Sequence, residues 1–504
     1  MELIKKRIHY VREGKKIFDQ FYVDEDYNVP EAKEDVRRIV DTGTELKIEE
    51  IRPVENYVRI TGKLYFRILY LNVSSDPKPG VLEGKLPFEE MVYAENQEGE
   101  EFYVQNVRIE FTPSLIHSRK LSLRAMVELE VGREKLVDEE TVTDAEGDVP
   151  LYKKMKKVQL LQLEVTKKDT YRIKEEITIP GTKESIGQIL FTDISERKLE
   201  LRPGQDELIV RGELFLFCMY LSGDEKPDWI SQTIPYEGRI PCEGISEEMY
   251  FSIRHTMEDT LTDLRMDEDG EMRILGIEGT LALHMNFYRE ESVELLEDLY
   301  SLQKQCLFDT TEVVCEELLM QNQSKCKVTE RLSLPELKTD VLQILHARGA
   351  IQVEHADRTG EGIRVEGILH LSFLYLRGDD AEPYGSWQGM IPFEHQIECK
   401  EMPEETVYNM EQHIEQLQIT LVGSESVEIK GILTFDTFLR RPVKVWTMEN
   451  VREEPLDLEQ LEKRPSIVGH IVQRGEDLWQ LAKQYMTTKE GIMEVNGMQN
   501  ENVK

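Results

Sequence analysis

Histidine, cysteine and paired carboxylates are the side chains of this chain that could carry out catalysis or hold a metal. The 10 histidines are scattered, and no H-E-x-x-H or H-x-H spacing places two of them together for zinc. No G-x-S-x-G turn, phosphate-binding loop or dinucleotide fingerprint occurs. Acidic pairs such as Glu89-Glu90 and Glu404-Glu405 could serve glycoside hydrolysis, but in so acidic a chain we expect them on solvated surfaces. We therefore expect no catalytic residue, no metal and no cofactor.

The sulfur and imidazole groups have a structural explanation. Without a C-x-x-C pair, the cysteines are expected to be buried or incidental thiols in a reducing compartment. They are Cys218, Cys242, Cys306, Cys315, Cys326 and Cys399. His284 and His370 fall within predicted strands, where we expect them to pack in the core or at its rim. We find neither a secretory signal nor a membrane span, which predicts a cytoplasmic protein.

The charge balance limits the partners. Asp and Glu number 98 against 62 Lys and Arg, which gives a formal charge of -36. Such a surface repels phosphate backbones and anionic lipids, so nucleic acid and direct membrane insertion are not expected. Two explanations remain open: the acid keeps a large protein soluble, or it attracts a basic protein partner.

Four landmarks occur three times in the same order, about 150 residues apart, which identifies a triplication. The strongest is a glycine-centred motif, found at Val58–Leu71, Leu208–Leu221 and Ile363–Leu376. The other landmarks are Val29-Pro30, Ile179-Pro180 and Leu334-Pro335; Val40, Leu190 and Leu345; and Leu86-Pro87-Phe88-Glu89, Ile234-Pro235-Tyr236-Glu237 and Ile391-Pro392-Phe393-Glu394.

Each unit has the residue pattern of β-structure. Around Gly62, apolar residues alternate with polar ones, which predicts a strand with one face in the core and one in water. Toward Leu71 both faces become apolar, so we expect the strand to end between two layers. The repeated glycine indicates either a bulge or the close approach of another backbone. A second alternating strand closes each unit, at 121–129, 277–285 and 429–435. The fold class expected is mainly β, with three tandem β-sandwich-like repeats plus a small α+β module.

The expected domains follow from these landmarks. The repeats are placed at 10–150, 159–305 and 313–445, and units of this size could each fold alone. Residues 446–467 are acidic and lack alternation, which predicts an extended linker with a short helix at 456–463. The last module is placed at 468–504.

In this last module the apolar residues follow a helical rather than a strand periodicity. Residues 470–474 are expected to form a strand, and Asp477 is expected to cap a helix with an apolar stripe from Leu478 to Tyr485. Thr487 with Glu490 predicts a capping box for a second helix. Asn496-Gly497 predicts its left-handed end.

The motif His470–Ala482, followed by Tyr485 and Asn496-Gly497, resembles the LysM module. That family's pattern is V-x-x-G-D-T-L-W-x-I-A, and its members bind N-acetylglucosamine-containing glycans, such as peptidoglycan, between two loops. The resemblance implies a ligand- or partner-binding site at Gly475, Glu476, Asp477, Leu478, Trp479, Asn496, Gly497 and Met498. The family's Asp-Thr is Glu-Asp in this chain, and the family's closing Gly-x-x-Leu strand has no counterpart before Lys504.

A triplicated unit followed by a LysM module resembles the SPOCS-domain proteins of spore-forming, clostridial-type Firmicutes. The resemblance implies a non-catalytic spore-coat scaffold in the mother-cell cytoplasm at the forespore surface. Its LysM module would bind the coat-basement ATPase, stage IV sporulation protein A, and other coat proteins would be partners. The alternative is a protein that binds peptidoglycan or muropeptide glycans through the same module.

Overall fold

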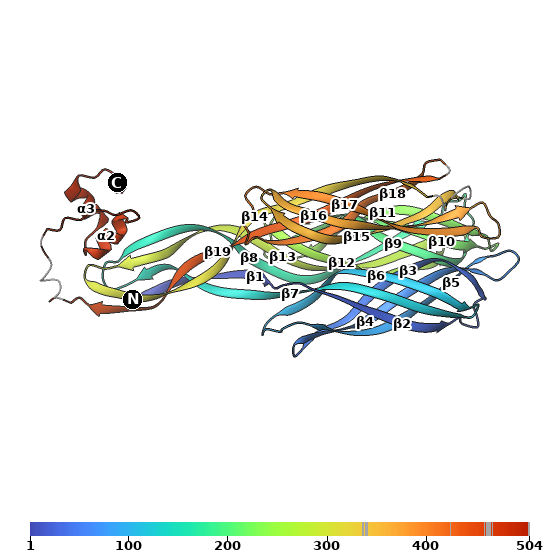
Figure 1. Ribbon diagram of the computed structural model, residues 1–504, viewed down its shortest axis with the longest axis horizontal. Helices are drawn as coiled ribbons and strands as arrows, with labels where there is room; N and C mark the ends of the chain where they lie inside the picture. The colour runs from blue at the N-terminus through green and yellow to red at the C-terminus, as the bar shows by residue number, and fades with distance from the viewer. Residues whose placement is uncertain are drawn as a thin grey trace.

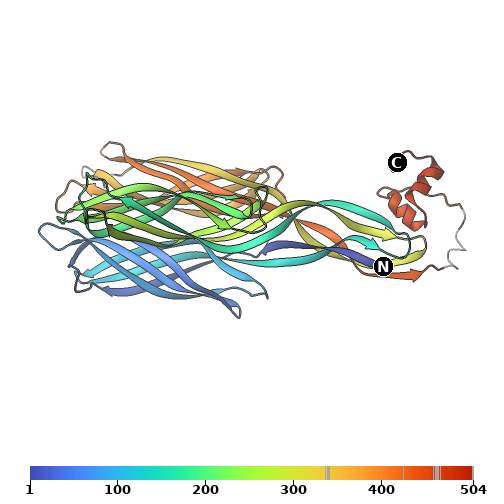
Figure 2. The same ribbon diagram turned by 180° about the vertical axis from the view of Figure 1, so that it is seen from behind.

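The chain is described by a computed structural model that covers residues 1–334, 337, 341–423, 425–457, 459, 465 and 467–501. Almost all of it is β-structure, arranged as three repeats and a small helical module (Figure 1). The repeats make an elongated head that narrows into a stalk, and the helical module lies at the far end of the stalk, as both views show (Figures 1 and 2).

The strands follow the same order in each repeat. The first repeat contains β1 (Glu2–Glu13), β2 (Ile17–Asn28), β3 (Val36–Val54), β4 (Tyr57–Asn72), β5 (Pro79–Tyr93), β6 (Glu101–His117) and β7 (Lys120–Glu146). The second contains β8 (Tyr152–Thr178), β9 (Ile186–Pro203), β10 (Glu207–Ser222), β11 (Pro227–Pro241), β12 (Tyr250–Met266) and β13 (Met272–Tyr300). The third contains β14 (Lys304–Ser333), β15 (Val341–Thr359), β16 (Gly362–Arg377), β17 (Tyr384–Glu398), β18 (Val407–Leu421) and β19 (Ser426–Pro455).

Each repeat is built from two antiparallel sheets, which confirms the mainly β class and the three tandem units. One sheet has the order β3-β4-β5, repeated as β9-β10-β11 and β15-β16-β17. In the other sheet, the last strand of the repeat pairs with both the first and the penultimate strand, as in β8-β13-β12 and β14-β19-β18. In the first repeat the first strand is split, and β1 and β2 pair with successive parts of β7. The two sheets enclose each repeat's own core.

The repeated glycine is explained by both structural reasons considered above. Opposite Gly62, the partner strand β3 carries a bulge between Ile48 and Glu50. A Cβ at Gly62 would also lie 2.3 Å from the Lys47 carbonyl oxygen and 2.8 Å from the Phe88 ring. Phe88 belongs to another landmark, so the two motifs recur together because the aromatic ring packs on the glycine.

The three repeats share a central core. Residues at equivalent positions in the three copies meet in one cluster, which places the copies around a common approximate threefold axis. The cluster contains Val40, Leu190 and Leu345 together with Leu69, Met219 and Leu374. This explains why β4 is buried on both faces after Arg67. The repeats are therefore packed on one another rather than linked as separate units.

The stalk is made by the outer halves of the longest strands. β1 pairs with β7, β8 with β13, and β14 with β19, and these three ribbons extend beyond the head. Equivalent side chains from the ribbons again pack together, including Ile8, Val158 and Val313. Because a β-strand rises by about 3.3 Å per residue, the part of the ribbon from Tyr288 to Tyr300 is roughly 40 Å long.

The expected linker was partly wrong. Residues 446–455 belong to β19 and pair with Lys304–Glu312 of β14, and Met448 is buried in the stalk. Apolar and polar residues alternate only weakly in this segment because a two-stranded ribbon buries only a narrow strip of its side chains. Most of the predicted helix at 456–463, and Pro335 of the first landmark, lie outside the described residues. The domain limits themselves remain a prediction.

The last module contains two short helices, α2 (Leu478–Gln484) and α3 (Lys489–Asn496). Asp477 caps α2 and Gly497, at φ 63°, ends α3, as predicted. The capping residue of α3 is Thr488 rather than Thr487. The predicted strand at 470–474 is wrong: these residues pair with no described strand. The His470 imidazole instead contacts the Tyr485 hydroxyl and the Glu476 carboxylate.

Candidate functional site

The tip of the stalk holds the helical module through Trp479, one of the predicted ligand-binding residues. The Trp479 side chain is 7% exposed, and its indole Nε1 donates to Asp298 Oδ2 at 2.7 Å. The indole meets the Tyr300 ring edge-on, with centroids 5.0 Å apart. Trp479 therefore packs between β13 of the second repeat and Ala482 and Ile492 of its own module, and not in solvent.

Asp298 is the centre of this contact. Its second oxygen, Oδ1, accepts from Lys483 Nζ at 2.6 Å. The neighbouring Tyr300 hydroxyl donates to the Thr487 carbonyl at 2.9 Å, and Tyr152 stacks on Tyr300 at 5.0 Å. The end of the second repeat thus presents an acid and two tyrosines that match the tryptophan and lysine of α2. We call the five residues Tyr152, Asp298, Tyr300, Trp479 and Lys483 the tip contact.

Asp477 has both a local and a tertiary role. Its Oδ1 accepts from the Gln480 backbone N–H at 2.8 Å, and its Oδ2 lies 3.2 Å from Lys154 Nζ of β8. Burial raises the pKa of this carboxyl, but the Gln480 N–H and the Lys154 ammonium outweigh burial and hold the pKa below its ordinary value. An anionic Asp477 therefore stabilises the helix and its position on the stalk.

The other residues of the first predicted loop are also engaged. Glu476 accepts from the Gln473 N–H at 2.8 Å and lies 2.8 Å from His470 Nε2, and these two contacts lower its pKa. Leu478 is buried in the module.

Gly475 and the second loop have a different environment. Gly475, Asn496 and Gly497 are exposed, and Met498 is half-buried. A Cβ placed on Gly475 or Gly497 would meet no atom within 4 Å. The Asn496 amide donates to the Ile492 carbonyl at 2.8 Å. Across the part of the chain that the structure describes, no side-chain hydrogen bond joins these residues to Glu476 or Asp477.

Two exposed apolar side chains of the module were not among the predicted site residues. Ile471 and Val495 are 88% and 86% exposed. For Ile471 the sequence signal is the Ile471-Val472 pair, which predicts a strand at 470–474.

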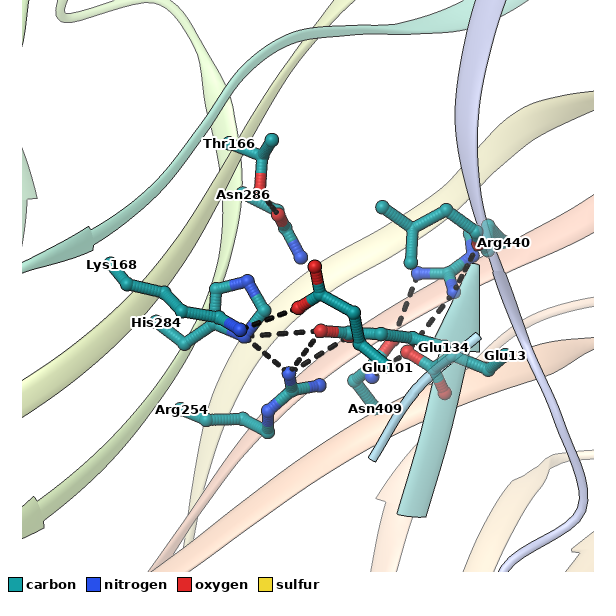
Figure 3. Close-up of polar contacts among 11 residues, drawn as sticks. Glu13, Glu101, Glu134, Thr166, Lys168, Arg254, His284, Asn286, Asn409 and Arg440 are labelled. Atoms are coloured by element: carbon teal, nitrogen blue, oxygen red, sulfur yellow. Dashed lines mark hydrogen bonds and ion pairs between the residues drawn. The ribbon is translucent and has the colours of Figure 1, made fainter. Parts of the chain in front are cut away.

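A second polar cluster, drawn in Figure 3, lies between the core of the third repeat, which reaches Leu439, and the stalk, whose apolar cluster begins at Val443. Arg440 of β19 is 1% exposed. Its Nε donates to Glu316 at 2.9 Å, its Nη1 donates to Asn409 at 2.8 Å, and its Nη2 lies 3.2 Å from Glu13 of β1. The guanidinium therefore joins the third repeat to the first.

The second repeat joins the same cluster through Arg254. Its Nη2 lies 2.9 and 2.8 Å from the two carboxylate oxygens of Glu134 and 2.5 Å from His284 Nδ1. The guanidinium stacks over Tyr103 at 3.6 Å. Burial, followed by Arg254 and Lys168, lowers the pKa of His284 to about 4, so this imidazole is neutral and accepts from Arg254. Glu134, Tyr288 and Arg440 occupy equivalent positions in the three repeats, which the sequence alignment of the copies could have revealed.

The polar groups of this cluster pair with one another. His370 contacts Gln352 at 2.7 Å, as expected for a histidine at the rim of a core. All six cysteines are free, and burial raises the pKa of each thiol. The described residues contain no group of three or more His, Cys, Asp or Glu side chains that could hold a metal. In the same residues, no helix is long and apolar enough to cross a membrane.

Comparison with known proteins identifies both kinds of domain. The family model described as SipL, SPOCS domain matches residues 35–112, 185–265 and 340–422, once in each repeat. The LysM domain model matches residues 470–504. Both are binding modules, and no enzyme family is found. No curated protein and no solved structure matches the chain.

Proposed function

For this chain, which belongs to the SPOCS-domain proteins and ends in a LysM domain, we propose the function of a non-catalytic spore-coat assembly scaffold. The LysM domain binds the coat-basement ATPase, stage IV sporulation protein A. The three repeats hold other coat proteins, and the protein works in the mother-cell cytoplasm at the forespore surface.

The separation of the two ends supports this proposal. The LysM domain lies at the tip of a stalk that extends roughly 40 Å beyond the head. Apolar packing of the three ribbons on one another holds the stalk together over this distance. A protein with one binding module at each end can connect a basement layer to the material deposited on it.

The exposed side chains of the LysM domain favour a protein ligand. Ile471 and Val495 stand in solvent, whereas Trp479, the aromatic ring suited to a sugar, is buried in the tip contact. Apolar side chains of this kind gain free energy when a protein surface covers them.

The test is co-purification of stage IV sporulation protein A with the full chain and with its variants. Ile471→Glu and Val495→Glu should each weaken binding about tenfold, because a charge would be buried at the contact. Truncation after residue 467 should abolish binding. Met390→Thr, which removes a methionine that is 63% exposed on the third repeat, is the matched control and should bind normally. Undiminished binding by the truncated chain would refute the proposal.

Glycan binding is the second candidate function. The LysM match and the exposed Gly475, Asn496 and Gly497 favour it. Titration of the full chain with muropeptides should then saturate, and Asn496→Ala should weaken the affinity while Asp477→Asn keeps the helix cap. Absence of saturation at millimolar glycan would exclude this candidate.

A further inference from the structure

Exposed apolar side chains are concentrated in the first repeat. Among the described residues, thirteen large hydrophobic side chains are exposed between residues 1 and 146, against three in each of the other two repeats. The three copies share one fold, so the fold does not require this excess. Something specific to the first repeat must explain it.

Four of these side chains form one patch on the outer face of the sheet β3-β4-β5. Tyr57 pairs with Val54 on one side and Tyr93 on the other, and Met91 precedes Tyr93 by two residues on the same face of β5. The Tyr57 and Tyr93 rings meet edge to face at 5.5 Å. The four side chains are 39–57% exposed. We call Val54, Tyr57, Met91 and Tyr93 the tyrosine patch.

The other repeats provide an internal comparison. The cross-strand register gives the equivalent positions as Gly204, Glu207, Arg239 and Pro241 in the second repeat, and Thr359, Gly362, Gln396 and Glu398 in the third. None of these eight residues is aromatic, and seven are polar, charged or glycine. In the other two copies the same sheet position therefore carries no aromatic side chain, and Pro241 is its one apolar residue.

The core of the repeat does not use the patch. The residues between its members, Val58 and Val92, point inward and are 0% and 2% exposed. Alternation therefore places the tyrosines on the face opposite the core. Exposed apolar clusters of this kind commonly mark protein–protein contact sites.

The rim of the patch is acidic at the β3–β4 turn, whereas Arg52 and Arg59 lie beside Met91 at its other end, where Arg59 pairs with Glu89. Glu55 follows Val54 in the β3–β4 turn, and Glu95 and Glu98 follow Tyr93. The Asn96 amide donates to the Glu55 carbonyl at 3.1 Å, which holds this loop against the turn. None of these three carboxylates has an ion pair with a described residue, because Arg133 and Lys135, the cations nearest the loop, donate to the Glu95 and Glu98 carbonyl oxygens instead. Unpaired acids beside two tyrosines attract lysine and arginine, both by charge and through cation–π contact.

We propose that the tyrosine patch is a docking surface for a basic segment of a partner protein that alternates cationic and apolar side chains. The apolar residues cover Tyr57, Met91 and Tyr93, and the cations face Glu55, Glu95 and Glu98. A second copy of this acidic chain, at -36, does not match such a rim. The surface lies on the head and is independent of the LysM domain's function.

The test uses three synthetic octapeptides and the full chain. The peptides alternate Lys with Leu, Glu with Leu, or Lys with Ser, and binding is followed by fluorescence anisotropy. The variant Tyr57→Glu/Met91→Arg places the second repeat's residues at the equivalent positions and leaves the net charge unchanged. The Lys-Leu peptide should bind the unmodified chain saturably and the variant about tenfold more weakly. The other two peptides should bind weakly to both proteins.

Met390→Thr is the control, since it removes an exposed methionine from the corresponding sheet of the third repeat and also introduces the second repeat's residue. It should bind the Lys-Leu peptide normally. Equal affinity of the unmodified chain and the double variant would overturn the proposal, because general attraction to an acidic protein would then suffice. Preference for the Glu-Leu peptide, or self-association abolished by the double variant, would also overturn it. Equal thermal melting of the variants checks that folding is retained.

Discussion

Arg440, in the last strand of the third repeat, lies 3.2 Å from the carboxylate of Glu13, in the first strand of the first repeat. Arg440 is buried between the core of the third repeat and the stalk cluster. It links the two ends of the triplicated region, and Arg440 also holds Glu316 of its own repeat.

Replacing Arg440 tests how much this contact stabilises the fold. Arg440→Met should lower the free energy of unfolding by about 3–5 kcal/mol, because it leaves the buried Glu316 and the largely buried Glu13 carboxylates without their cation. Arg441→Met is the matched control: Arg441 pairs with Glu317, is 42% exposed, and should cost at most about 1 kcal/mol. Urea unfolding measures both.

A rescue variant separates charge from packing. Adding Glu13→Gln and Glu316→Gln to Arg440→Met removes the unpaired charges and should recover part of the lost stability. If the triple variant were no more stable than Arg440→Met alone, the loss would come from packing, and the electrostatic explanation would fail.

The neutral His284 predicts a dependence of stability on pH. Its pKa in the folded protein, about 4, is below its ordinary value of 6.5. Between these values the unfolded chain binds a proton that the folded chain does not, so the stability contribution is complete above pH 6.5 and is lost as the pH falls toward 4.

His284→Gln should therefore flatten the decline of the unfolding free energy between pH 6.5 and 4, while glutamine can still accept from Arg254. Urea unfolding at a series of pH values measures this slope. His117→Gln, at an exposed hairpin end, is the control. Identical slopes for the unmodified chain and His284→Gln would contradict the assignment.

The tip contact predicts that Asp298 fixes the LysM domain. Asp298→Ala removes the acceptor of both Trp479 and Lys483, and should weaken docking by about 1.5–3 kcal/mol. Hydrogen exchange of α2 should accelerate, and the emission of Trp479 should shift to the red. Glu294→Ala, an exposed change on the same strand, should alter neither. Unchanged exchange in Asp298→Ala would show that the domain is held by other contacts.

The sequence predicted the repeats and their strands because these depend on local patterns. The alternation around Gly62 and the switch to two buried faces near Leu71 both appear in the structure. The sequence did not reveal the threefold packing, although Val40, Leu190 and Leu345 were among its landmarks. Their shared position on an axis depends on contacts between copies, which no single strand pattern contains.

The candidate site was predicted less completely. Asp477 and Gly497 cap helices as their types and positions indicated. Trp479 was recognised as part of the module, but its partner Asp298 lies in another domain and in an unremarkable acidic stretch. The β19 extension was missed for a related reason: its pairing with β14 provides backbone hydrogen bonds and needs little apolar alternation.

The stalk also determines how the copies are joined. Every repeat enters and leaves through the stalk tip, where the β7–β8 and β13–β14 connections lie beside the amino terminus, whose ammonium is 3.7 Å from Glu453. Short connections at the tip supply covalent linkage, while the head is assembled by packing. Cleavage at 147–151 and at 301–303 would therefore leave three fragments that stay together as a complex. The three repeats are thus arranged like the subunits of a trimer that are covalently linked at one end.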